Sequence, residues 1–114
     1  MWAATADAPD TVARVDTINL VVFVSTALSD GALVNAVATA TEAKTQALVE
    51  SGFDGSGTAS DAVCVLTPVD DDQEQFCGPR SPVGASVARA VHRAVAVGAA
   101  RWTQRHGEAK RGSA

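Results

Sequence analysis

The stretch from Ala27 to Phe53, ALSDGALVNAVATATEAKTQALVESGF, is predicted to form one long helix, and a predicted strand lies on either side of it in the sequence. Ser29 is a favoured N-cap, and Gly52 is a favoured residue just beyond a helix C-terminus. The periodicity gives one mainly apolar stripe, which comprises Leu33, Val37, Ala40, Thr41, Lys44 and Leu48. A thin flank of alanines lies beside it, so we expect the helix to pack close to a sheet; they are Ala32, Ala36, Ala40, Ala43 and Ala47.

Two predicted strands flank this helix along the chain. The segment 17–25, TINLVVFVS, is apolar at both alternating sets of positions, and the segment 61–68, DAVCVLTP, has a similar buried character until Pro68 ends it. A strand that is apolar on both faces is typical of a sheet that is covered on both sides. A second helix follows, with Ser81 as its N-cap and Pro82 as its first residue. Its predicted apolar face contains Val83, Val87, Ala90, Val91, Ala94 and Gly98.

The order strand, helix, strand, helix predicts an α/β fold, a layered β-α-β-α unit, with α+β as the alternative. Two strands alone do not make a stable sheet with both faces covered. We therefore expect an incomplete sheet and a fragment of a larger α/β domain. Residues 1–16 are predicted to be an irregular lead-in, residues 17–102 to form the domain, and residues 103–114 to be a disordered polar tail.

Composition excludes several classes of function. The 114 residues carry a net charge of −4, which argues against a nucleic-acid surface. The two cysteines have neither disulfide nor metal-ligand spacing, and we expect Cys64 in the core and Cys77 in a more exposed loop. The sequence has no signal peptide and no apolar run long enough to span a bilayer. The expectation is a soluble cytoplasmic protein that binds no metal, membrane or nucleic acid.

Lys44 stands in the middle of the apolar stripe of the first helix. On geometry alone, the favoured interpretation is that its stem packs while its amine reaches water. The alternative is that the helix faces a site here and that a buried amine binds an anion. Glu42 is only two residues away, so it points to the other side of the helix and cannot pair with Lys44. Geometry alone favours an ordinary solvated glutamate at that position.

The segment 55–61, GSGTASD, is a glycine-rich and hydroxyl-rich loop that leads into the second strand. Backbone N–H groups of such loops can hold an oxyanion or a phosphate. Thr58 or Ser60 is a candidate nucleophile, and Asp61 is a candidate base or orienting group. A flexible turn is the favoured interpretation without further context.

Arg80, in GPRSP, comes just before the N-terminus of the second helix. An arginine at that place is a candidate for binding an anion or an amide carbonyl, and the alternative is an exposed loop arginine. His92 and His106 have no Ser or Cys partner at a recognisable spacing, so no histidine-based triad is predicted.

Taken together, these segments resemble a known family. TINL, ATEAKTQAL and GTASDAV occur in the order and spacing of the C-terminal half of the adenosylcobinamide amidohydrolases of cobamide salvage, and GPRSPVGASVARAVHRAV continues the resemblance. It runs from about Thr17 to Val95. The glycine that usually precedes TIN in the family is Asp16 here, and the N-terminal portion of the family has no counterpart in this sequence.

The resemblance implies hydrolysis of the amide that joins the corrinoid to aminopropanol in adenosylcobinamide, giving adenosylcobyric acid. The implied substrate is a corrinoid, and no cofactor is implied beyond the cobalt in its ring. Two alternatives stay open: an inactive remnant, or half of a split enzyme that needs a separate N-terminal half, and a corrinoid-binding module. A homo-oligomer is a further expectation, because an incomplete sheet has an exposed edge.

The matched polar residues supply the predicted site. Amide hydrolysis needs an activated nucleophile, stabilisation of the oxyanion, and an acid for the leaving amine. We expect Lys44 to act electrostatically or in proton transfer, the GTASD loop to donate to the oxyanion, and Asp61 or Glu42 to activate water. The predicted substrate-binding residues are Asn19, Thr39, Thr58, Ser60 and Arg80. The resemblance thus favours a site lysine over one that reaches water.

Overall fold

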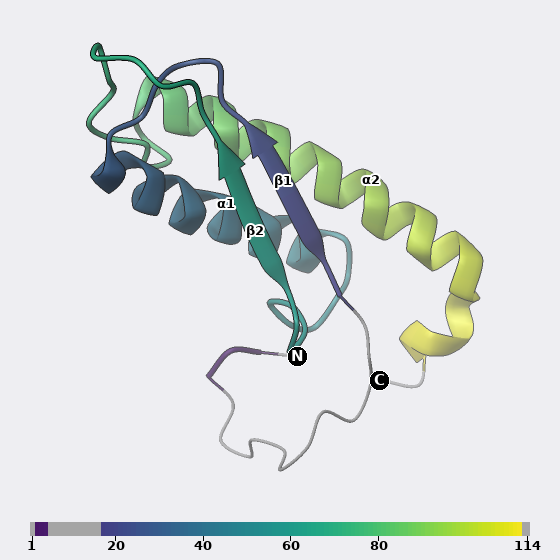
Figure 1. Ribbon diagram of the computed structural model, residues 1–114. Helices are drawn as coiled ribbons and strands as arrows, with labels where there is room; N and C mark the ends of the chain where they lie inside the picture. The colour runs from purple at the N-terminus through teal and green to yellow at the C-terminus, as the bar shows by residue number, and fades with distance from the viewer. Residues whose placement is uncertain (1, 5–16, 113–114) are drawn as a thin grey trace.

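The chain folds as two strands and two helices in the order β-α-β-α, as predicted (Figure 1). The computed structural model describes residues 2–4 and 17–112, with side chains up to residue 106. Its elements are β1 (Asn19–Phe23), α1 (Asp30–Glu50), β2 (Ala62–Leu66) and α2 (Pro82–Gly112). The strands pair in parallel, with Asn19 opposite Ala62 and Phe23 opposite Leu66. Both helices lie on the same face of this sheet, behind it in Figure 1.

Helix α1 begins and ends where its capping residues predict. The Ser29 hydroxyl accepts a hydrogen bond from the Ala32 N–H at 3.1 Å, and Gly52, just past the end, has a φ of 91° that favours glycine. The buried face is the alanine flank rather than the whole predicted stripe, since Val37 is 40% exposed and Thr41 is exposed. Helix α1 packs against both the sheet and α2. Its backbone lies so close to them that its buried positions have room for little more than a methyl group. The wholly buried alanines are Ala32, Ala36, Ala40 and Ala47.

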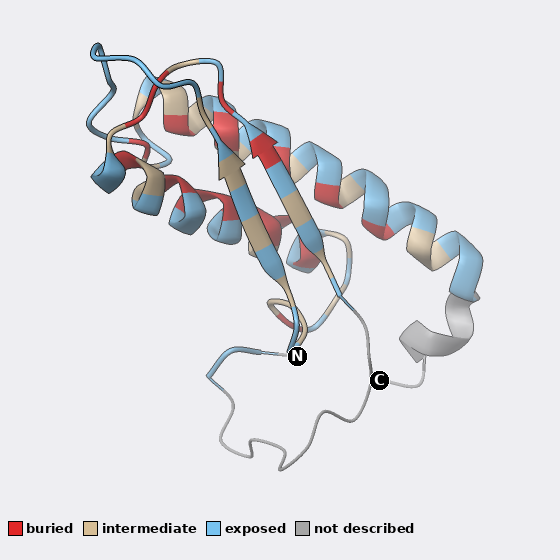
Figure 2. Cartoon of the chain, viewed as in Figure 1, coloured by how far each residue is buried: buried red, intermediate tan, exposed pale blue. Residues whose placement is uncertain are grey.

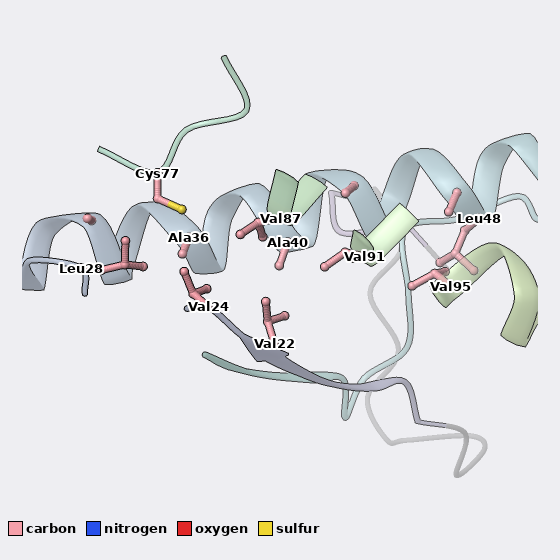
Figure 3. Close-up of a cluster of buried hydrophobic side chains, with 13 residues drawn as sticks. Val22, Val24, Leu28, Ala36, Ala40, Leu48, Cys77, Val87, Val91 and Val95 are labelled. Atoms are coloured by element: carbon pink, nitrogen blue, oxygen red, sulfur yellow. The ribbon is translucent and has the colours of Figure 1, made fainter. Parts of the chain in front are cut away.

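The core lies between the covered face of the sheet and the two helices (Figure 3). Its larger buried members are Val22, Val24, Leu28, Leu48, Val87, Val91 and Val95. The predicted face of α2 is confirmed at Val87 and Val91. It is wrong at Ala90, Ala94 and Gly98, which are exposed, because the buried stripe continues instead through Val95 and Ala99.

The second face of the sheet is bare in the part of the chain that the structure describes (Figure 2). Val21 is 58% exposed, Phe23 is 78% exposed and Leu66 is 45% exposed. The prediction of a strand covered on both sides is therefore wrong for the described residues, because no described helix lies over this face. Cys64, which pairs with Val21 in the ladder, is exposed on the same face, so its predicted place in the core is wrong as well.

The acidic loop between β2 and α2, which contains VDDDQEQ at residues 69–75, is anchored to the rest of the fold. Leu28 and Glu74 form an isolated parallel bridge. The Glu74 N–H donates to the Ala27 carbonyl at 2.9 Å, and the Ser29 N–H donates to the Glu74 carbonyl at 3.0 Å. The middle of this loop is thus tied to the segment that leads into α1.

Cys77 ends this loop in a wholly buried position, so the prediction of an exposed cysteine is wrong. Its N–H donates to Asn35 Oδ1 at 2.8 Å, and its carbonyl accepts from Thr39 Oγ1 at 2.7 Å. Two polar side chains of α1 therefore satisfy the buried backbone on both sides of Cys77, and burial raises the pKa of its thiol.

Helix α2 is described as far as Gly112, and it includes residues 103–112 of the predicted polar tail. Trp102 packs edge-on against Phe53 with ring centroids 5.7 Å apart, and it stacks on His106 at 4.2 Å. These aromatic contacts anchor a stretch whose polar composition suggested fraying. Neither α1 nor α2, as described, combines the length and the hydropathy that a membrane crossing requires.

The predicted lead-in, residues 1–16, lies outside the described residues except at 2–4. There Trp2 Nε1 donates to Asp54 Oδ1 at 2.7 Å, and the Ala3 N–H donates to Ser56 Oγ at 3.1 Å. This start of the chain therefore contacts the glycine-rich loop.

Candidate functional site

The carboxylate of Asp61 joins three segments that are far apart in the sequence. Lys44 Nζ, from α1, donates to Asp61 Oδ2 at 2.9 Å. The Ile18 N–H, just before β1, donates to Oδ1 at 2.9 Å. The Thr58 N–H donates to Oδ2 at 3.0 Å, and the Thr58 hydroxyl donates to Oδ1. The sequences TINL, ATEAKTQAL and GTASDAV therefore meet at one side chain.

Lys44 does not reach water, because its side chain is only 8% exposed. The interpretation that geometry alone favours, a packed stem with a solvated amine, is therefore wrong. Burying an ion pair carries a large desolvation cost, which is offset only when the remaining lone pairs are hydrogen-bonded. Ile18 and Thr58 supply those hydrogen bonds to Asp61.

Gly57 makes room for this ion pair. Its φ is +154°, and a Cβ there would lie 2.1 Å from Asp61 Oδ2 and 2.8 Å from Lys44 Nζ. The glycine-rich loop does present a backbone N–H to an anion, but that anion is the chain's own Asp61. Ser60 shares a hydrogen bond with the Thr17 hydroxyl beside it.

The pKa of Asp61 reflects these contacts. Burial raises the pKa of the carboxyl, but hydrogen bonds from Thr58, from the Ile18 N–H and from Lys44 outweigh burial and lower the pKa from 3.8 to about 2. A carboxylate with such a low pKa and with occupied oxygens is a weak base. The arrangement favours a positioning role for Asp61, and its predicted catalytic role stays a prediction.

Acid should therefore weaken the fold through Asp61. Because its folded pKa lies below the value of 3.8 expected in the unfolded chain, its contribution is complete above about pH 5 and is lost progressively as the pH falls through the folded pKa of about 2. The shift corresponds to about 2 kcal/mol of unfolding free energy. Urea unfolding between pH 2 and pH 7 measures this loss. Asp61→Asn should flatten the curve over that interval, and an unchanged acid dependence in this variant would contradict the assignment.

The Lys44–Asp61 pair lies at the amino-terminal edge of the sheet. Ile18 comes immediately before β1, and Asp61 comes immediately before β2. Lys44 belongs to the second half of α1. In open α/β sheets, ligands usually bind beyond the carboxyl ends of the strands. The position of the pair thus also favours a role in holding the fold together.

A separate cavity of about 200 Å³ lies between α1 and α2. Glu42 lines it, together with Thr39, Ala43, Gln46, Pro79 and Ala88. Glu42 is exposed, whereas Lys44 is buried against Asp61, in agreement with the prediction that the two do not pair. The three predicted catalytic residues therefore do not converge on one point.

The other predicted residues occupy different places. Asn19 is exposed in β1, and Arg80 is exposed just before α2, on the loop that leaves the carboxyl end of β2. No local sequence signal marks Asn35, which accepts the Cys77 N–H, because the two residues lie 42 positions apart. Among the described residues, no three His, Cys, Asp or Glu side chains gather closely enough to hold a metal ion.

Comparison with known proteins gives a consistent result. The model of the family described as adenosylcobinamide amidohydrolase matches residues 1–107, which is wider at both ends than the resemblance found in the sequence. An adenosylcobinamide amidohydrolase of Halobacterium salinarum is 42% identical over 80 residues, which make up 69% of this chain and 34% of that relative. One of Methanosarcina mazei is 42% identical over 69 residues, 60% of this chain and 32% of the relative.

The matched stretches thus span about a third of each relative. No solved structure matches the chain. The family model nevertheless covers nearly the whole sequence, including the three segments that meet at Asp61. The chain belongs to the adenosylcobinamide amidohydrolase family.

Proposed function

We propose that this chain forms part of an enzyme that hydrolyses adenosylcobinamide. The observation that carries the proposal is the family match over residues 1–107. Water would attack the amide carbonyl, the C–N bond would break, and the nitrogen of aminopropanol would take up a proton. The products would be aminopropanol and adenosylcobyric acid, which would return to cobamide synthesis.

Glu42 is the residue that we propose as the base in this reaction. Its carboxylate is exposed and lines the cavity between α1 and α2, so a water molecule can reach it. Asp61 is less suited because its oxygens accept hydrogen bonds from Ile18, Thr58 and Lys44. The proposed role of the Lys44–Asp61 pair is to fix α1, and with it Glu42, against the sheet. No cofactor is part of the proposal beyond the cobalt of the substrate.

The test is release of aminopropanol from adenosylcobinamide, measured by mass spectrometry. The full chain is assayed alone and fused to the part of the Methanosarcina mazei relative that lies outside its matched residues. We expect the fusion to turn over substrate, and Glu42→Gln to lower kcat by about 10²-fold or more, as for loss of a general base. The melting temperature should not change, because Glu42 is exposed.

Each contrary outcome has a distinct meaning. Corrinoid binding without release of aminopropanol would contradict the hydrolase and favour a binding module. Full turnover by Glu42→Gln would remove Glu42 from the reaction but keep the hydrolase. As a matched control, Glu74→Gln changes a carboxylate on the acidic loop whose backbone, not its side chain, makes the contacts described above.

The match to about a third of each relative favours a second candidate, half of a split enzyme. This candidate predicts no turnover by the chain alone and turnover when the remaining part of the family is supplied. Equal turnover by the chain with and without that part would contradict it.

A further inference from the structure

We propose that β1 accepts an additional β-strand along its open edge, and that this strand comes from the part of the family that this chain does not match. The described sheet contains two strands, β1 and β2. The inference concerns assembly, so it does not depend on which reaction the assembled protein performs.

The backbone of β1 has hydrogen-bonding groups directed away from β2. The Ala62 N–H donates to the Ile18 carbonyl at 3.1 Å, and the Val24 N–H donates to the Leu66 carbonyl at 2.9 Å. The backbone N–H and C=O groups of the even-numbered residues of β1 therefore point toward β2. Because these groups alternate along a strand, those of Asn19, Val21 and Phe23 point to the opposite edge. No other strand among the described residues pairs with this edge, and such an edge is a template for a further strand.

Helix α2 extends over the space beside this edge. A groove of about 410 Å³ separates the last part of β1 from the first turns of α2. Most of its lining is apolar, and it consists of Val22, Phe23, Val24, Ser25, Thr26, Pro82, Val83, Ser86, Val87 and Ala90. In Figure 1, α2 runs along the β1 side of the sheet. A strand paired with β1 would direct alternate apolar side chains into this groove, beneath α2.

A second copy of this chain is a poor occupant. Two β1 edges that pair around a two-fold axis must run antiparallel, which keeps both copies of α2 on the same face of the joined sheet. Each α2 would then enter the space beside β1 that the other already covers. The edge suits a strand that brings no helix to this face.

The chain's own lead-in is also a poor occupant. A hairpin through a turn of two to four residues would place residues 7–11, DAPDT, beside the last part of β1, where the groove lies. Proline and aspartate are depleted in strands, and a proline there lacks the N–H that pairing requires.

The unmatched part of the family is the occupant that the observations favour. About two thirds of each relative lies outside the matched stretch, which is ample length for further strands. The bare sheet face is consistent with such an addition, since Phe23 is 78% exposed and Val21 is 58% exposed. Sheets with crossover helices are normally covered on both faces.

Amide hydrogen exchange tests the proposal residue by residue. In the isolated chain, we expect the amides of Val21 and Phe23 to exchange rapidly and those of Leu20 and Val22 to be protected. In the fusion to the unmatched part of the Methanosarcina mazei relative, exchange at Val21 and Phe23 should slow by about tenfold or more. Should the fusion fail to fold, the unmatched part can be added to the labelled chain as a separate polypeptide, with the same readout.

Val21→Pro tests pairing at the open edge of β1 without removing a hydrogen bond between β1 and β2. Proline at this position removes an N–H that points away from β2, so the isolated chain should tolerate it. In the fusion it should abolish the protection of Phe23 and lower the melting temperature by about 5 °C more than in the isolated chain. Val69→Pro, at a fully exposed loop residue, is the matched control and should affect neither protein.

Three outcomes would overturn the proposal. In the first, the amides of Val21 and Phe23 exchange equally fast in both proteins, or Val21→Pro lowers the melting temperature of both proteins by the same amount. In the second, their amides are already protected in the isolated chain in a concentration-dependent way, which would identify a second copy as the occupant. In the third, that protection is independent of concentration and is lost when residues 1–16 are deleted, which would identify the lead-in.

Discussion

Gly84→Ala is expected to lower the melting temperature by about 10 °C or more. An added Cβ would lie 1.8 Å from the Gly78 carbonyl oxygen and 2.6 Å from the Cys77 carbonyl carbon. These are backbone atoms, so no side chain can turn aside. The same Gly78 carbonyl accepts the N–H and hydroxyl of Ser81, at 3.0 Å and 2.8 Å, which fixes it at the start of α2. The first turn of α2 must therefore move or unwind.

Gly98→Ala is the matched control in the same helix, and it should have the opposite sign. Nothing lies within 4 Å of an added Cβ there. Alanine is favoured over glycine in a helix interior by about 1 kcal/mol. Thermal unfolding followed by circular dichroism measures both variants. Equal effects would mean that α2 does not start against residues 77–78 as described.

Asp61→Asn is expected to reduce the unfolding free energy by about 3 kcal/mol, because it leaves the amine of Lys44 buried without its counter-charge. Lys44→Met should cost less, about 1–2 kcal/mol, since Asp61 keeps its hydrogen bonds from Ile18 and Thr58. The double variant should be more stable than the sum of the two losses predicts, because it has no unpaired buried amine. Urea unfolding at pH 7 provides all three values.

Asp71→Asn makes the same chemical change on the exposed acidic loop and should alter the stability by less than about 0.5 kcal/mol. Additive losses for Lys44→Met and Asp61→Asn would show that the two side chains do not interact in solution. If Asp61→Asn reduced the unfolding free energy no more than Asp71→Asn does, the result would contradict the hydrogen bonds described around Asp61.

The fold was predictable from the sequence because local signals and periodicity agree. Ser29, Gly52 and Pro82 mark the helix ends, and the β-α-β-α order follows from where they stand. Burial was harder to predict. In α1 the alanine flank is buried rather than Val37, because close packing against two partners favours small side chains over hydrophobic ones. The positions of Cys64 and Cys77 are reversed for a similar reason: burial here depends on what covers a residue, and not on whether it lies in a strand or a loop.

The candidate site was predictable only in part. Periodicity placed Lys44 on the buried side of α1 and Glu42 away from it, as the structure has them. That the partner of Lys44 is Asp61, seventeen positions along the chain, depends on how the crossover from α1 into β2 turns, which no local pattern encodes. Likewise, the hydrogen bonds of Asn35 and Thr39 to Cys77 span 42 and 38 positions. Single-residue propensities carry no information about contacts at such separations.

The hydrogen bonds around Asp61 also specify which alignment of the two strands is correct. A shift of β2 by two residues along β1 would keep every apolar side chain on its present face, because the side-chain period of a strand is two. With β2 moved in one direction, Leu20 would lie opposite Val65 and Val22 opposite Thr67, instead of Val63 and Val65. The same shift would carry Asp61 about 7 Å away from the Ile18 N–H and from Lys44. The ion pair thus distinguishes two alignments that hydrophobic packing alone scarcely separates, and its main contribution is to make the misaligned sheet costly.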